Sequence, residues 1–193
     1  MVKISIKKKI TLSLTVVAGL FIATIMTGYY PVVLVDNSPI FFGTWQKTEE
    51  AQKKFTNVQA SSSGLDPVDF AARENKDILR AFKITALNLL IENKIIEQEG
   101  GKVIPDFNDL SKKRLESVMA GEGDLSGAVK TVYSLSISEF KNLILLPQAR
   151  RDVLRIFLAN DGKNFDDWLK ARKKEKTVKT KFIPFRWNGT ELE

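Results

Sequence analysis

Residues 76–99, KDILRAFKITALNLLIENKIIEQE, carry the strongest helical pattern in the chain. One row of apolar residues follows the spacing of successive helical turns: Ile78, Phe82, Ala86 and Leu89. Four more residues widen this row into a broad stripe: Leu79, Leu90, Ile91 and Ile95. A stripe of this width predicts a helix that buries one face and organises a helical core around it. We expect Gly100-Gly101 to end the helix, because glycine favours helix C-termini.

Signals for helix starts recur on both sides of this segment. We expect helices to begin at Thr44, which suits an N-cap, and at Asp66-Pro67, where proline follows a capping residue. Further helices are predicted from Asp106 to Gly121, from Leu125 to Val132, from Ser136 to Phe157 and from Asn164 onward. Ser136 and Glu139 form a capping-box sequence, and Pro147 should kink or divide the helix that contains it.

Two segments have the composition of short β-strands. Val32–Val35 is apolar and largely β-branched, and the Asp36-Asn37 pair that follows it favours a tight turn. Ser38–Ile40 is the second arm of this hairpin, and its Pro39 requires an edge position. A further strand is predicted from Val178 to Phe182. The predicted fold is therefore mainly α, with short β arms near the start and the end of a helical domain, and the pattern leaves open whether these arms pair.

The N-terminal part of the chain has the composition of a membrane anchor. Residues 10–30, ITLSLTVVAGLFIATIMTGYY, contain no charged side chain, and as a helix they reach about 31 Å, close to the hydrocarbon thickness of a bilayer. Four lysines precede this run, which places residues 1–9 in the cytoplasm and the rest of the chain outside. A cleaved signal peptide is the main alternative, although the run lacks the small-residue pair of a cleavage site, and a buried core helix is the other. The expected organisation is a basic cytoplasmic tail (1–9), a single-pass anchor (10–30), an extracytoplasmic helical domain (31–183) and a C-terminal tail (184–193).

Composition excludes many kinds of active site. The chain has no histidine and no cysteine, so it cannot form histidine-based nucleophile systems, thiolate metal sites or disulfides. We therefore expect no catalytic, cofactor-binding or metal-binding residues. The net charge of +7 is concentrated at the N-terminus, because without the four lysines of residues 1–9 the chain has 26 basic against 23 acidic residues. This weak excess does not indicate a nucleic-acid partner.

Several blocks of sequence, taken in their order, resemble the N-terminal domain of the SurA-type chaperones. The first is VVLVDNSPI (32–40), with Trp45 at the position of the aromatic residue that opens the next helix. The second is LNLLIENKIIEQEG (87–100), and the third is SLSISEFKNLI (134–144). FDDWLKARKKEKTVK (165–179) is similar to the closing helix and strand of the family. The family includes membrane-anchored PpiD-like proteins and PrsA-like foldases, which usually carry a parvulin isomerase domain; we expect none here, because few residues follow Phe182 and the chain has no histidine.

The resemblance implies a membrane-anchored, extracytoplasmic chaperone that binds unfolded or extended polypeptides without ATP and is not an enzyme. Seven aromatic residues near the two ends of the domain are the candidates for the peptide-binding surface: Phe41, Phe42, Trp45, Phe70, Phe182, Phe185 and Trp187. A non-catalytic adaptor that docks one membrane or envelope protein is the alternative function. The other expected partner is membrane lipid, contacted through the N-terminal helix. The basic stretch LKARKKEKTVKTKF (169–182) suits a solvated helix end, or a contact with anionic lipid or acidic clients.

Overall fold

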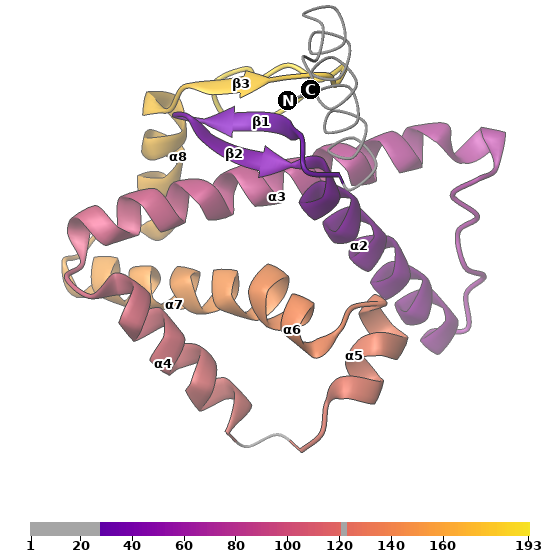
Figure 1. Ribbon diagram of the computed structural model, residues 1–193, viewed down its shortest axis with the longest axis horizontal. Helices are drawn as coiled ribbons and strands as arrows, with labels where there is room; N and C mark the ends of the chain where they lie inside the picture. Colours follow the sequence, from indigo (N-terminus) through magenta and orange to yellow (C-terminus); the bar gives the residue numbers. More distant parts are fainter. Residues whose placement is uncertain (1–27, 121–122) are drawn as a thin grey trace, which may run out of the picture.

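The computed structural model describes residues 28–120 and 123–193 (Figure 1). Helix makes up 66% of the structure and the strands form one small antiparallel sheet, so the prediction of a mainly helical fold with short β arms is confirmed. In chain order the elements are β1 (Pro31–Val35), β2 (Ser38–Phe41), α2 (Phe42–Ser62), the 3-10 turn η1 (Arg73–Asn75), α3 (Lys76–Val103), α4 (Phe107–Met119), α5 (Ser126–Tyr133), α6 (Ile137–Phe140), the π-helical segment η2 (Lys141–Leu145), α7 (Leu146–Asn160), α8 (Phe165–Glu175) and β3 (Val178–Thr180).

The sheet joins the two ends of the domain. Its strand order is β2-β1-β3, so the first strand lies in the middle and pairs with the last strand of the chain (Figure 1). The predicted turn at Asp36-Asn37 is confirmed, because both residues have positive φ angles, 54° and 103°, and close a two-residue hairpin. Pro39 lies on β2, at the edge of the sheet, as its missing N–H requires. The question left open by the sequence is thus answered: the β arms pair.

The main core lies along α3, between the sheet and α7 (Figure 1). Ala86, Ile91 and Ile95, from the stripe that the sequence indicates, are completely buried. The sheet covers them from one side and α7 and α8 contribute Leu154 and Leu169 from the other. The N-terminal turns of α3 extend beyond this core, since Ile78 is 41% exposed.

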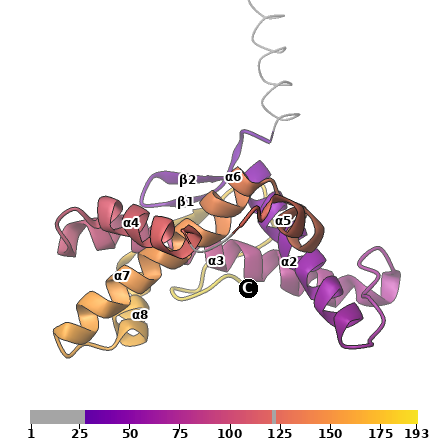
Figure 2. The ribbon, with the colours of Figure 1, turned by 90° about the horizontal axis from the view of Figure 1, so that it is seen from below.

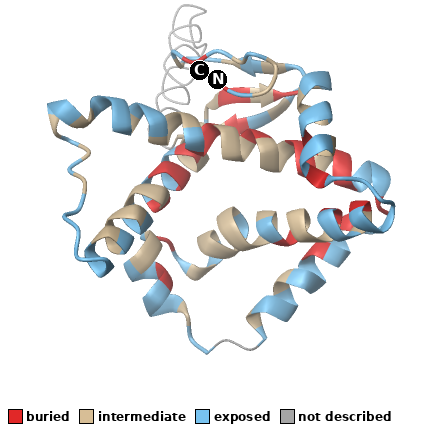
Figure 3. Cartoon of the chain, turned by 180° about the vertical axis from the view of Figure 1, so that it is seen from behind, coloured by how far each residue is buried: buried red, intermediate tan, exposed pale blue. Residues whose placement is uncertain are grey.

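The remaining helices spread out from this core. Seen from below, α2 and α7 run apart from one another (Figure 2). A second, smaller apolar cluster joins α2 to α5 and the α6–η2 segment through Ala51, Val129 and Leu135. Much of the surface of α2, α3 and α7 is half-buried, and only part of it is fully buried (Figure 3). Apolar side chains are therefore left at partly accessible positions between the helices.

Two predicted helix starts are wrong. α2 begins at Phe42 instead of Thr44, because its first N–H groups are capped by backbone: Phe42 N–H donates to the Tyr30 carbonyl and Gly43 N–H to the Gly28 carbonyl, both at 3.0 Å. No helix begins at Asp66-Pro67 either. There the Asn57 side chain holds the backbone N–H and C=O of Val68, which fixes this segment as a loop up to η1.

The predicted helix end at Gly100-Gly101 is also wrong, since α3 continues to Val103. Gly100 is buried, and a Cβ added there would lie 2.4 Å from ring carbons of Phe107, whereas one added at Gly101 meets nothing within 4 Å. Gly100 therefore serves the packing of α3 against α4. At the other end of the chain β3 stops at Thr180, two residues earlier than predicted, because Phe182 adopts a left-handed φ of 60°.

The structure describes the predicted C-terminal tail but very little of the predicted N-terminal anchor. Residues 184–193, expected to be a tail, fold back onto the domain: Leu192 is 2% exposed and its N–H donates to the Asn88 side-chain oxygen at 2.8 Å. The basic tail (1–9) and all but the last three residues of the anchor predicted for residues 10–30 lie outside the described residues. Within the ranges that are described, no helix is both long and apolar enough to cross a bilayer.

Candidate functional site

Two adjoining hollows, of about 340 and 280 Å³, meet at Phe41. They share Phe41, Thr44, Asn142 and Leu143, so we treat them as one surface and call it the Phe41 groove. The other residues that line it are Gly28, Tyr29, Pro39, Ile40, Gly43, Lys47, Leu90, Asn93, Lys94, Glu97, Glu139, Pro147 and Arg150. The groove thus draws on β2, α2, α3, α6, η2 and α7.

Phe41 lies in the groove because it joins the end of β2 to the start of α2. It is the last residue of β2 and also the N-cap of α2, with an extended backbone (φ −88°, ψ 150°). Its half-buried ring packs edge-on against Tyr29, with ring centroids 6.1 Å apart. Ile40, just before it, is only 4% exposed and belongs to the core, although it also borders the groove. The alternation of a strand therefore turns the more accessible ring of Phe41 toward the groove.

The opposite wall of the groove is an interrupted helix. In η2 the Leu146 N–H donates to the Lys141 carbonyl, five residues back, in place of the usual four. Pro147 comes next and has no N–H, so it cannot donate to the Asn142 or the Leu143 carbonyl in either helical register. The helix predicted to kink or divide at Pro147 thus changes its hydrogen-bond register just before this residue, from η2 to α7. Pro147 therefore donates no backbone hydrogen bond in the segment that lines the groove.

The charged groups around the groove are paired with each other. Lys47 binds the Glu139 carboxylate, and this contact together with hydrogen bonds from Ser136 lowers the pKa of Glu139 to about 2. Burial raises the pKa of Glu97, but Lys94 at 2.6 Å and Arg150 at 2.8 Å outweigh this effect, so that its net pKa is lowered. With these charges neutralised, the groove presents apolar side chains and the carboxamides of Asn93 and Asn142.

Most of the seven predicted aromatic residues belong to the core or border it. Trp45 and Phe185 are 7% and 4% exposed and pack edge-on, and the Trp45 indole N–H donates to the Lys83 carbonyl at 3.1 Å. Phe42 joins this pair from one side, at 5.8 Å from Trp45. Trp187 is half-buried against the same core. These four side chains are brought together, but their main contacts are with the fold.

The other three predicted aromatic residues lie in three different places. Phe41 lines the groove, as described. Phe70 lies apart, against Phe82 of α3 at 5.0 Å, beside a separate hollow of about 310 Å³ between α2 and α3. Phe182 is 84% exposed and touches Tyr30 edge-on at 6.5 Å. The seven residues therefore do not form one binding surface.

The residues that sequence reasoning missed lie on η2 and α3. Asn142 and Leu143 follow the capping box and read as ordinary positions of a helix. Pro147 was the available signal, since an interrupted helix frees backbone carbonyls near the interruption. The sequence could not indicate that this segment faces Phe41, because about a hundred residues separate the two.

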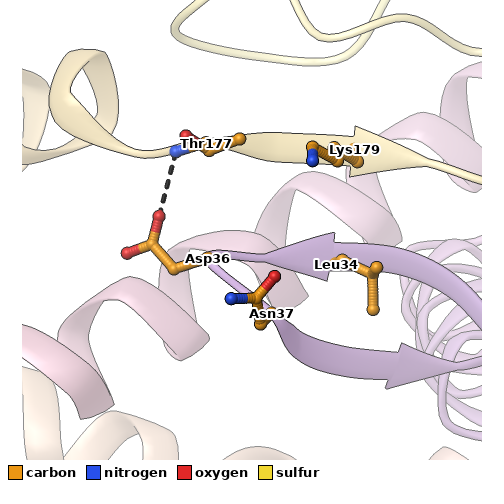
Figure 4. Close-up of a pocket in the computed structure, with 5 residues that line it drawn as sticks. All are labelled: Leu34, Asp36, Asn37, Thr177 and Lys179. Atoms are coloured by element: carbon orange, nitrogen blue, oxygen red, sulfur yellow. Dashed lines mark hydrogen bonds between the residues drawn. The ribbon is translucent and has the colours of Figure 1, made fainter.

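A further hollow lies on the sheet, and it has a structural explanation (Figure 4). There the Asp36 carboxylate accepts the Thr177 N–H at 3.0 Å and binds Lys176 at 2.5 Å; its pKa is lowered, chiefly by Lys176. Lys176 also binds Glu99 at 2.6 Å, and both of these side chains are largely buried. Burial lowers the pKa of Lys176, but these hydrogen bonds outweigh it and the net pKa is raised. This cluster ties the hairpin turn and α3 to the segment that enters β3.

Comparisons with protein-family models, with curated proteins and with solved structures found no significant match. The described residues also contain no group of three or more acidic side chains arranged to hold a metal ion. The function is therefore argued from the geometry of the Phe41 groove and from the sequence.

Proposed function

We propose that this chain is a membrane-anchored, extracytoplasmic chaperone-like protein that binds extended or unfolded polypeptide segments in the Phe41 groove without ATP or catalysis. Its architecture would be that of the N-terminal domain of SurA-type chaperones, with residues 10–30 as the anchor. The observation that carries the proposal is the groove itself: an apolar floor bordered by amide groups and by charges that already have partners.

The chemistry of the groove suits a polypeptide with a neutral, partly apolar sequence. An unfolded chain exposes apolar side chains, which gain free energy on entering a hollow lined by Phe41, Leu90 and Leu143. It also exposes backbone N–H and C=O groups, and the two carboxamides can pair with these in any sequence. Such contacts are individually weak, and attachment to the membrane would raise the local concentration of sites near emerging chains.

Site-specific crosslinking tests the proposal. The chain has no cysteine, so Asn142→Cys, at an exposed position of the groove, can be labelled with a single photoreactive group in the full-length protein. Leu110→Cys, 41% exposed on α4, is the matched control. We expect several unrelated denatured proteins to crosslink at position 142 at least fivefold more efficiently than at position 110. Equal crosslinking at the two positions would contradict the proposal.

A substitution in the groove provides a second test of the proposal. Leu143→Arg places a charge on the apolar floor and should abolish most of the suppression of client aggregation, whereas Ile156→Arg, at a 58% exposed position of α7, should not. Thermal unfolding of both variants shows whether the fold is kept. Crosslinking at position 142 in host membranes distinguishes an adaptor from a chaperone. One stoichiometric crosslinked protein supports an adaptor, and a broad set of exported proteins supports a chaperone.

A further inference from the structure

The two most exposed large apolar side chains of the described residues are both neighbours of Tyr30. They are Phe182, 84% exposed, and Tyr29, 69% exposed. Both flank Tyr30: Tyr29 precedes it in the chain, and the Phe182 ring touches it edge-on. Neither the core nor the groove explains Phe182, which is absent from the lining of the groove and buries little of its own surface.

The backbone of Phe182 is held in an unfavourable conformation. Its φ of 60° lies in the left-handed region, which is unfavourable for a bulky residue and favours glycine. If Phe182 served the packing of the core, burial of its ring would offset this cost, but the ring projects into solvent. An exposed aromatic residue at a strained position points to a contact outside the domain.

The uncharged run of residues 10–30 ends at the same place. Its last residues belong to the fold, since the carbonyls of Gly28 and Tyr30 accept the N–H groups of Gly43 and Phe42 at 3.0 Å. No spacer therefore separates the end of this run from the domain. If the run spans a bilayer, Tyr29 lies at the level of the lipid headgroups, and Phe182, whose ring lies against Tyr30, is close to that level.

The charges beside Phe182 suit such a surface. Lys179 and Lys181 are exposed and make no ion pair within 28–120 and 123–193, whereas Lys176 and Lys173, closer to the core, bind carboxylates. Lysine side chains are attracted to an anionic membrane surface, and aromatic rings favour the interface between headgroups and acyl chains.

We propose that Phe182 and Tyr29, with Lys179 and Lys181, form a lipid-docking surface that holds the folded domain against an anionic membrane. The contact rests on the anchoring part of the proposed function but not on polypeptide binding. It fixes the orientation of the domain, so the Phe41 groove, which Tyr29 also lines, opens beside the membrane surface.

A fluorescent probe measures this contact in the full-length protein. Phe182→Cys is labelled with an environment-sensitive fluorophore and reconstituted into phosphatidylcholine vesicles with or without phosphatidylglycerol. Ile156→Cys, also an exposed apolar position, is the control. We expect a blue-shifted emission at position 182 and at least a twofold loss of its intensity with a nitroxide-labelled lipid headgroup, and neither change at position 156. The quenching should be stronger with phosphatidylglycerol, and Lys179→Glu with Lys181→Glu should remove that difference.

Each other outcome overturns the inference in a recognisable way. If the protein floats with the vesicles but the probe at position 182 is as accessible to water as the probe at position 156, lipid docking is wrong and the anchor stands. Protein that does not float overturns both. A blue shift that needs an added denatured polypeptide, with no quenching from lipid, reassigns Phe182 to client binding.

Discussion

Gly100 and Gly101 form a matched pair within one helix, and replacing each by alanine tests the packing of α3 on α4. In a helix interior alanine is more favourable than glycine by about 1 kcal/mol, so both substitutions carry the same local gain. They differ in what the new methyl group meets. At position 101 it meets nothing within 4 Å, but at position 100 it falls 2.4 Å from two ring carbons of Phe107.

That overlap decides whether alanine at position 100 raises or lowers the free energy of unfolding. Ordinary contact begins near 3.4 Å, so the ring or the helix has to shift by about 1 Å. Phe107 is 2% exposed and has no free space to turn into, which makes the substitution a case of overpacking that costs about 2–3 kcal/mol. After the propensity gain, we expect Gly100→Ala to lower the free energy of unfolding by about 1–2 kcal/mol, and Gly101→Ala to raise it by up to about 1 kcal/mol.

Denaturation followed by far-UV circular dichroism measures both effects. For a chain of 193 residues, we expect Tm to fall by about 3–6 °C for Gly100→Ala and to rise by about 2–4 °C for Gly101→Ala. The double variant Gly100→Ala with Phe107→Leu should lose less stability than the sum of the losses in the two single variants. Equal stabilisation by the two alanines would refute the reasoning, because it would mean that α4 does not pack on Gly100.

Three further changes test other parts of the fold. Asn164→Ala removes the N-cap acceptor of α8, which binds two backbone N–H groups at 2.8 and 3.1 Å, and should lower the free energy of unfolding by about 1 kcal/mol in urea denaturation. Lys176→Met leaves Glu99 with Lys102 as its only cation and should cost about 2–3 kcal/mol by the same measurement; a loss below 0.5 kcal/mol, as for an exposed pair, would contradict the buried cluster. The pKa of Glu139 is lowered to about 2 from 4.5, so its contribution to stability is complete above pH 4.5 and disappears as the pH falls toward 2. Glu139→Gln should therefore lose less stability than the parent chain between pH 4.5 and 2, and parallel pH profiles would contradict the assignment.

Features that depend on neighbouring residues could be predicted from the sequence. The Asp36-Asn37 turn, the capping box at Ser136 and the Asn164 cap are each set by hydrogen bonds within a few residues. The buried stripe of α3 is likewise a periodic property of one helix. These elements were sufficient to predict a mainly helical fold with a few short β-strands.

Features that depend on distant residues could not be predicted in this way. Gly100 resembles a helix terminator until Phe107 is seen to occupy the space above it. The start of α2 depends on carbonyls at residues 28 and 30 that replace a capping side chain. The Phe41 groove combines β2 with a helix interruption about a hundred residues later, so no local pattern could indicate it.

The central position of β1 has a consequence for how the domain is made. Residues 31–35 leave the ribosome long before residues 178–180, yet the two strands pair side by side. Until residues 178–180 have been synthesised, β1 keeps one edge unpaired, and the edge that β3 later covers stays open to other strands. The nascent chain therefore carries an unfinished sheet while all the helices of the domain are made, and its completion waits for β3.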